Sequence, residues 1–364
     1  MQIDFHLCVT YVVSRIAGFG HREAETVAQC AQYVDDATNP GTITFDNGAM
    51  YSRTSSAHKI LDYKNFNELA NRYVWIPFHF LPGNNGKKAG ENPEGTFIEK
   101  LICRPGSFVA KDMINACIRG GNALYGLHRL GIALHVYADT WAHQGFAGVI
   151  HEINAVKKLD DKEKIDAEFG SKLKKFFGDI FDDIACEFAS GIIPLGHGAA
   201  LSLPDRPYLK WTYKDSSGKT VARDNPTQFL EAAHEMCRAV QRFRAGNPDA
   251  DVPGLAGADR ERIMRMMTDI KDENGDERCR KWIDALKEGF FGFPPVTLGY
   301  IPKGTGSWKY QAIGSDKDVD IETEKHPYSP SFLGSDWKLF HDALMAHRFS
   351  IINEILPRYG ICAA

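Results

Sequence analysis

The chain lacks a run of about eighteen apolar residues, the length that a membrane-spanning helix needs. It also lacks a secretory signal, because Asp4 stands where such a signal carries Lys or Arg before an unbroken apolar stretch. We therefore expect no transmembrane segment and a chain that is cytoplasmic as synthesised. Any export would follow a non-classical secretion route.

The chain also has no strong net charge of either sign and no closely paired cysteines. The formal net charge is −4 over 364 residues, and the basic residues are scattered, unlike the basic face of a dedicated duplex binder. We expect no stable nucleic-acid partner, which leaves nucleic acid open as a substrate. The eight cysteines form no Cys-x-x-Cys pair, a pattern that favours reduced core thiols over a disulfide frame or a thiolate zinc site.

Strand-like alternation is short and rare, whereas the helical period dominates the chain. The pattern predicts an all-α, multi-helix bundle with long loops. The expected helices span residues 9–16, 23–36, 115–146, 162–190, 226–245, 260–270, 279–290 and 337–356. Residues 1–245 are expected to form a metal-binding helical domain. Residues 246–364 are expected to form a C-terminal helical extension, either a lobe of its own or part of the same domain.

The most informative motif lies within the predicted central helix, where His135, Asp139 and His143 follow one another at four-residue steps. Residues four apart share a helix face. With a rise of about 1.5 Å per residue, the two histidines would lie roughly 12 Å apart, too far to share one ion. The spacing suits two or more ions with the carboxylate between them. A polar network without metal, or chance, is the alternative interpretation.

A metal centre needs more ligands than this helix offers. The candidates are His6 near the chain start, Asp35 and Asp36 at the end of the second predicted helix, His79 in an aromatic loop, and His197 between glycines. Asp205 follows in a proline-flanked turn, and a simple turn explains it equally well.

The order of these candidate ligands along the chain resembles the ligand pattern of the zinc-dependent phospholipase C superfamily. That superfamily also contains zinc-dependent single-strand nucleases. The matching positions are His6, Asp35 or Asp36, His79, His135 with Asp139, and His143. The missing signal peptide makes the chain similar to a divergent phospholipase C branch of proteobacteria and fungi.

The chain departs from the superfamily pattern at three points. His143 follows Asp139 after three residues where familiar members have five, and no N-terminal Trp is present. His197 stands in for the His of a later pair, which has no clean counterpart here.

The resemblance implies an all-α metal-dependent phosphoric diester hydrolase with two or three zinc ions and a phospholipid substrate at a membrane surface. Asp35 or Asp36 would act as general base toward water. The aromatic side chains that would line a substrate slot, or else pack as plain core, are Phe78, Phe80, Tyr137, Trp141 and Phe146. The alternatives are a zinc-dependent single-strand nuclease and a non-catalytic helical interaction protein with a structural metal.

Overall fold

The computed structural model describes residues 1–58, 68–156, 158–160, 196–200, 202–320 and 323–362. The helix expected at residues 162–190 lies outside these ranges.

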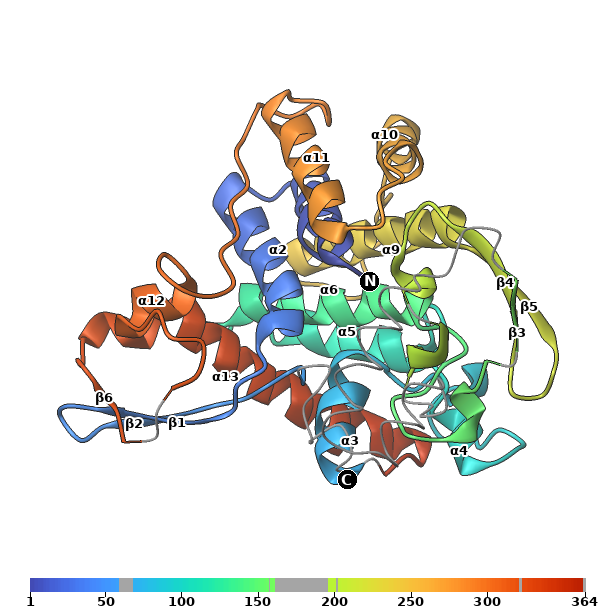
Figure 1. The fold of residues 1–364 in the computed structure, drawn as a ribbon, viewed down its shortest axis with the longest axis horizontal. Helices are drawn as coiled ribbons and strands as arrows, with labels where there is room; N and C mark the ends of the chain where they lie inside the picture. The colour runs from blue at the N-terminus through green and yellow to red at the C-terminus, as the bar shows by residue number, and fades with distance from the viewer. Residues whose placement is uncertain (59–67, 157, 161–195, 201, 321–322, 363–364) are drawn as a thin grey trace, which may run out of the picture.

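The central element is helix α6 (Gly126–Ala142), which is buried along nearly its whole length. Its residues are apolar on most sides, as expected for a helix enclosed by others. Helices α2 (His21–Asp36), α5 (Phe108–Arg119), α9 (Asn225–Ala245) and α13 (Asp336–Phe349) pack around it. Figure 1 shows this arrangement with α6 and α5 in green at the middle of the molecule.

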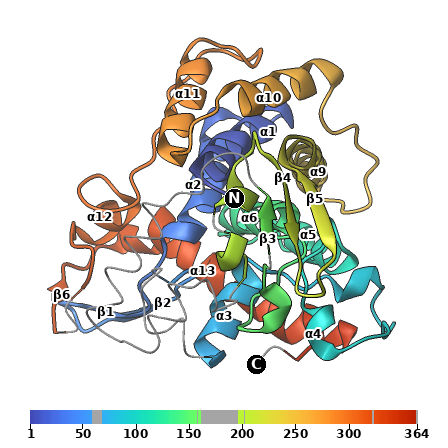
Figure 2. The ribbon, with the colours of Figure 1, turned by 45° about the vertical axis from the view of Figure 1, so that its right-hand side comes forward.

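The chain begins in a π-helix, η1 (Asp4–Val9), which continues directly into α1 (Thr10–Ile16). η1 packs against α2 and α11 (Gly275–Lys287), and α10 (Gly257–Asp269) packs on α9. In both ribbon views the first residue lies next to α6, near the centre of the molecule (Figures 1 and 2). The fold therefore brings the start of the chain to the helix that carries His135.

Two small sheets show that the expectation of an all-α fold is wrong. β1 (Gly41–Phe45) pairs antiparallel with β2 (Met50–Arg53) and parallel with β6 (Lys325–His326). β3 (Lys158–Asp160), β4 (Lys210–Lys214) and β5 (Thr220–Asp224) form an antiparallel sheet. Over the residues that the structure describes, 53% are helix and 8% are strand, which makes the fold mixed α and β.

The strands escaped prediction because they are at most five residues long, and so short a run carries little periodic signal. Strand β4 does alternate, since Trp211 and Tyr213 are buried while Lys210 and Lys214 are exposed. Its hairpin turn is closed by the carboxylate of Asp215, which accepts backbone N–H groups from the turn. These turn residues were the signal that could have identified the hairpin.

The single helix expected at residues 115–146 is two helices, because the chain leaves the helix at Gly120 and Gly121. The missed helices are α3 (Glu68–Phe78), α4 (Phe97–Lys100) and α12 (Trp308–Ile313). Near its end the chain continues from α13 through a second π-helix, η8 (Ser350–Ile355), and a 3-10 helix, η9 (Leu356–Tyr359).

One hydrophobic core joins side chains from Met1 to Ile361, and so contains residues from both sides of position 245. The described cysteines are free thiols, and all of them except Cys362 are buried. Within the described ranges, every helix is too short or too polar to cross a bilayer.

Candidate metal centre

Helix α6 and its C-cap residue present His135, Asp139 and His143 on one buried side. Asp139 Oδ2 lies 3.2 Å from His135 Nε2 and 3.6 Å from His143 Nδ1. Asp139 and His135 are almost fully inaccessible to solvent. The carboxylate therefore lies between the two imidazoles, as the four-residue spacing predicted.

Helix α2 approaches α6 closely because Gly131 has no side chain. A Cβ atom at Gly131 would lie 2.3 Å from the Val27 carbonyl oxygen of α2. One turn further along α6, His135 Nδ1 donates to the Ala31 carbonyl at 2.7 Å, so its Nε2 is left facing Asp139. The same contact brings Asp35 to the site, with Oδ1 3.9 Å from His135 Nε2.

Two further imidazoles are held in the same way by backbone carbonyl groups. His79, just beyond α3, donates from Nε2 to the Ser56 carbonyl at 2.9 Å, which turns its Nδ1 to within 3.5 Å of Asp139 Oδ2. His143 donates from Nδ1 to the carbonyl of His79 at 2.8 Å. A ring held by one nitrogen to a carbonyl presents the other nitrogen in a fixed direction, a common arrangement around bound metals.

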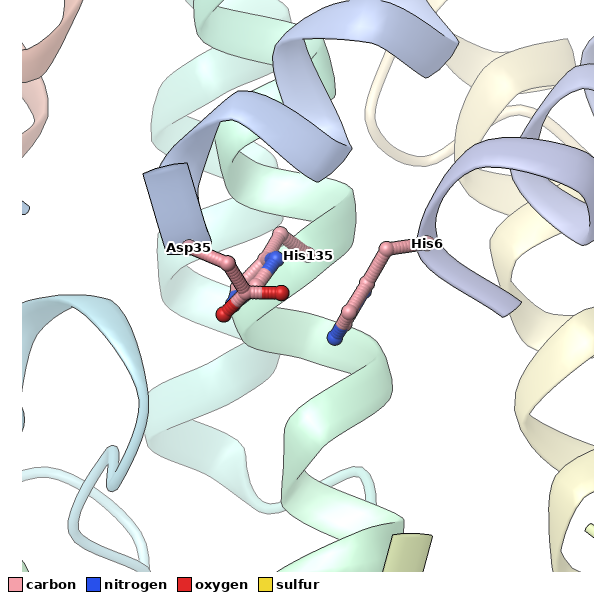
Figure 3. Close-up of side chains that lie close together, drawn as sticks. All are labelled: His6, Asp35 and His135. Carbon is pink, nitrogen blue, oxygen red and sulfur yellow. The ribbon is translucent and has the colours of Figure 1, made fainter. Parts of the chain in front are cut away.

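The π-helix η1 supplies His6 from the opposite side. Its ring stacks on that of His135 with 3.7 Å between the centroids, and its Nε2 lies 3.2 Å from Asp139 Oδ1. Figure 3 shows His6 and Asp35 reaching from opposite sides toward the space beside His135. The N-terminal elements η1 and α2 thus meet the distant helix α6 at one point.

At the other end of α6, the segment 196–205 contributes a second carboxylate. Asp205 closes the 3-10 helix η6 (Leu203–Asp205), with Oδ1 3.6 Å from His143 Nε2 and Oδ2 3.5 Å from His197 Nε2. Asp205, for which a turn was an equal explanation, belongs to the cluster. The sequence feature that could have identified Asp205 as a ligand is its apolar, proline-flanked setting close to His197.

These side chains form three groups that could hold a metal ion, and in each group the ligand atoms lie within 4.8 Å of one another. The groups are His6, Asp35 and His135; His79, His135 and Asp139; and His143, His197 and Asp205. The first two share His135, and Asp139 contacts His143 of the third. The arrangement can therefore hold more than one ion.

The charges at the cluster are unbalanced. The Met1 amino group lies 2.7 Å from Asp139 Oδ1 and 3.3 Å from Asp205 Oδ1. Burial opposes its charge, but the carboxylates of Asp139, Asp205 and Asp35 raise its pKa to about 11. Three carboxylates thus surround one ammonium group, and a further cation would be stabilised among them.

The pKa values of Asp139 and Asp35 shift in opposite directions. Burial disfavours the charge of Asp139, but the imidazole of His143, the Met1 amino group and the other imidazoles hold its pKa well below the usual range. Burial raises the pKa of Asp35 well above its ordinary value; the Met1 amino group opposes the rise, and negative neighbours such as Asp139 add to it. Of these two carboxylates, Asp35 is therefore the one whose charged form is less stabilised by its surroundings.

Buried polar atoms without hydrogen bonds test whether a metal fits these residues. Both ring nitrogens of His6, Asp139 Oδ2 and Asp205 Oδ1 are buried and make no hydrogen bond. Buried atoms of this kind need an explanation, and one ion among them would satisfy several of these atoms at once. A donor set of imidazole nitrogens and carboxylate oxygens suits zinc, so the residues present fit the implied ions.

Asp36, the alternative to Asp35, is not in these groups. Its Oδ2 accepts hydrogen bonds from Tyr300 Oη at 2.6 Å and from Gln32 Nε2 at 3.2 Å. The two adjacent aspartates point in different directions, and only Asp35 faces the histidines.

The five aromatic candidates divide into two sets. Phe80 stacks on His143 with 4.5 Å between centroids, and Phe146 packs edge-to-face on His197 with 6.2 Å between centroids, so both flank the cluster. The other three pack in the interior instead. Phe78 stacks on His347, and Tyr137 packs against Trp141.

A family model described as a family of unknown function (DUF6765) matches residues 1–355, nearly the whole chain. No curated protein and no solved structure gives a significant match.

Proposed function

The chain belongs to the DUF6765 family, and we propose that it is a zinc-dependent phosphodiesterase of phospholipase C type. Its substrate would be a phospholipid at a membrane surface, cleaved between glycerol and phosphate. The observation that carries the proposal is the convergence of imidazoles and carboxylates from five segments of the chain on one buried cluster. These residues are His6, Asp35, His79, His135, Asp139, His143, His197 and Asp205.

The three groups of ligand side chains would hold the ions. When bound, neighbouring zinc ions supply positive charge to a phosphate oxygen and lower the pKa of water. Three backbone carbonyls, those of Ala31, Ser56 and His79, fix the imidazole rings before any ion arrives. The imidazole side chains would therefore lose little conformational entropy when an ion binds.

Asp35 is the residue best placed to move a proton. Its side chain is 34% exposed, whereas the side chains of Asp139 and Asp205 are 1% and 12% exposed. It can therefore meet a water molecule or substrate at the open side of the cluster. Its partly exposed carboxylate would accept a proton from that water molecule, which is the role of a general base.

Phe80 and Phe146 would form the apolar wall beside the reacting group. Both lie against ligand histidines and both are almost fully buried. An apolar wall suits the glycerol and acyl part of a lipid. The small net charge and scattered basic residues offer little attraction to a polyanion, which favours a lipid over single-stranded DNA.

The experiment supplies zinc to the purified chain and measures phosphorylated head group released from phosphatidylcholine vesicles, with single-stranded DNA as the second substrate. Release by the parent and its loss in Asp139→Asn, but not in Asp36→Asn, would support the proposal. Cleavage of DNA alone would make the chain a nuclease. An inactive parent whose Asp139→Asn variant unfolds would indicate a structural metal in an interaction protein.

A further inference from the structure

Helix α11 holds the N-terminal π-helix through a buried guanidinium group. Arg278 is 1% exposed, and it donates from Nε to Asp4 Oδ2 at 2.7 Å and from Nη2 to Asp4 Oδ1 at 3.0 Å. This bidentate contact between a guanidinium and a carboxylate fixes both the position and the orientation of the two side chains. It links residues 274 positions apart.

The remaining donors of Arg278 also find acceptors. Nη2 donates to Gln2 Oε1 at 2.6 Å, and Nη1 donates to the carbonyls of Asp272 and Glu273 at 2.6 and 3.1 Å. A guanidinium has five N–H groups in a fixed fork, and here all three nitrogens are engaged. Arg278 therefore ties the first residues of the chain to the loop that precedes α11.

The geometry of η1 relates this contact to the metal centre. Asp4 and Cys8, one turn apart, face α11, where Cys8 Sγ lies 3.2 Å from Cys279 Sγ. Residues two apart point to opposite sides of a helix. His6, midway between Asp4 and Cys8, therefore faces away from α11 and stacks on His135.

We propose that Arg278 is a positioning residue for the metal centre. By holding Asp4 it fixes the rotation of η1, and with it the place of His6 beside Asp35 and His135. The affinity of that group for a divalent cation then depends on a side chain of α11 that contacts none of the ligands. This inference rests on the proposed metal centre but not on the proposed reaction.

The test measures zinc binding to the full chain by titration, for the parent and for Arg278→Lys, His6→Ala and the double variant. Lysine keeps the charge but cannot bind both oxygens of Asp4 in the same geometry. Arg278→Lys should weaken one zinc equivalent by about 10- to 100-fold, the range for partners that orient metal ligands. Since it acts through His6, the double variant should bind zinc no more weakly than His6→Ala alone.

Arg280→Lys is the matched control, because Arg280 lies on the same helix in an exposed ion pair with Glu277. It should leave zinc binding unchanged, and melting temperatures will show that every variant is folded during the titration. If Arg278→Lys does not fold, Asp4→Glu probes the same contact from the other side.

Parental affinity in Arg278→Lys, or losses that add in the double variant, would overturn the inference. A parent that binds no zinc would instead refute the metal centre itself.

Discussion

The rings of His6 and His135 stack face to face with 3.7 Å between their centroids. Burial lowers the pKa of His6 well below its ordinary value, and it lowers the pKa of His135 to about 4. Both rings are therefore neutral near pH 7, the state in which imidazole binds metals. Two neutral imidazoles in contact beside Asp35 form a site that is ready for a cation.

The adjacent aspartates of α2 give the first prediction. Asp35→Asn should abolish the zinc equivalent held with His6 and His135, because it removes the oxygen that faces them. Asp36→Asn is the control, since Asp36 bonds to Tyr300 instead. Zinc titration of the two variants makes the comparison. Equal losses in both would contradict the assignment of Asp35.

The approach of α2 to α6 gives the second prediction. Gly131→Ala places a Cβ against the Val27 carbonyl, and such overpacking costs about 1–3 kcal/mol. We expect lower stability together with weaker zinc binding, because the separation of the helices pulls Ala31 away from His135. Gly257→Ala on α10 is the control, since nothing lies within 4 Å of its added Cβ. Urea unfolding and zinc titration measure both effects, and tight zinc binding by Gly131→Ala would count against the role of this contact.

Helical periodicity located α2, α9, α10, α11 and α13 because their buried residues recur at helical spacing. It also located α1, which is buried on several sides. It missed the short strands because a strand with at most two buried residues, as in β1, β2, β4, β5 and β6, gives too little periodic signal. The all-α expectation followed from that weakness.

The centre of the cluster was predictable because the four-residue steps along α6 determine how its ligand side chains lie relative to one another. Asp139 had to lie between His135 and His143 once the segment was helical. The choice between Asp35 and Asp36 was not predictable, because it depends on how α2 is rotated against α6. That rotation is set by Gly131 and Ala31, a contact between segments that local patterns do not describe.

A buried histidine outside the cluster gives the third prediction. Burial lowers the pKa of His341 to about 3, whereas an unfolded histidine titrates near pH 6.5. Between these values the unfolded chain binds one proton more, so stability is present above pH 6.5 and falls as the pH drops toward 3. The expected slope is about 1.4 kcal/mol per pH unit for this group.

Urea unfolding at pH 7 and pH 5 measures that slope. The His341→Gln variant should lose less stability than the parent between the two pH values, by about 1–2 kcal/mol. An identical loss in both proteins would show that His341 does not contribute.

Metal removal gives the fourth prediction. Chelation should lower the Tm, because ions bound only to the folded state stabilise it by mass action. Added zinc should restore the parental Tm. Magnesium should not, since sites rich in imidazole favour zinc over magnesium. Thermal unfolding followed by circular dichroism measures each state, and a Tm indifferent to chelator and zinc would argue against a bound ion.

The most direct measurement is the zinc content of the purified chain by elemental mass spectrometry, with Asp139→Asn prepared in parallel. Asp139 contacts His6, His79, His135 and His143, so its carboxylate should be required for full occupancy. We expect two or three equivalents of zinc in the parent and a clear loss in the variant. A parent that carries no zinc after growth and titration with the metal would contradict the metal centre.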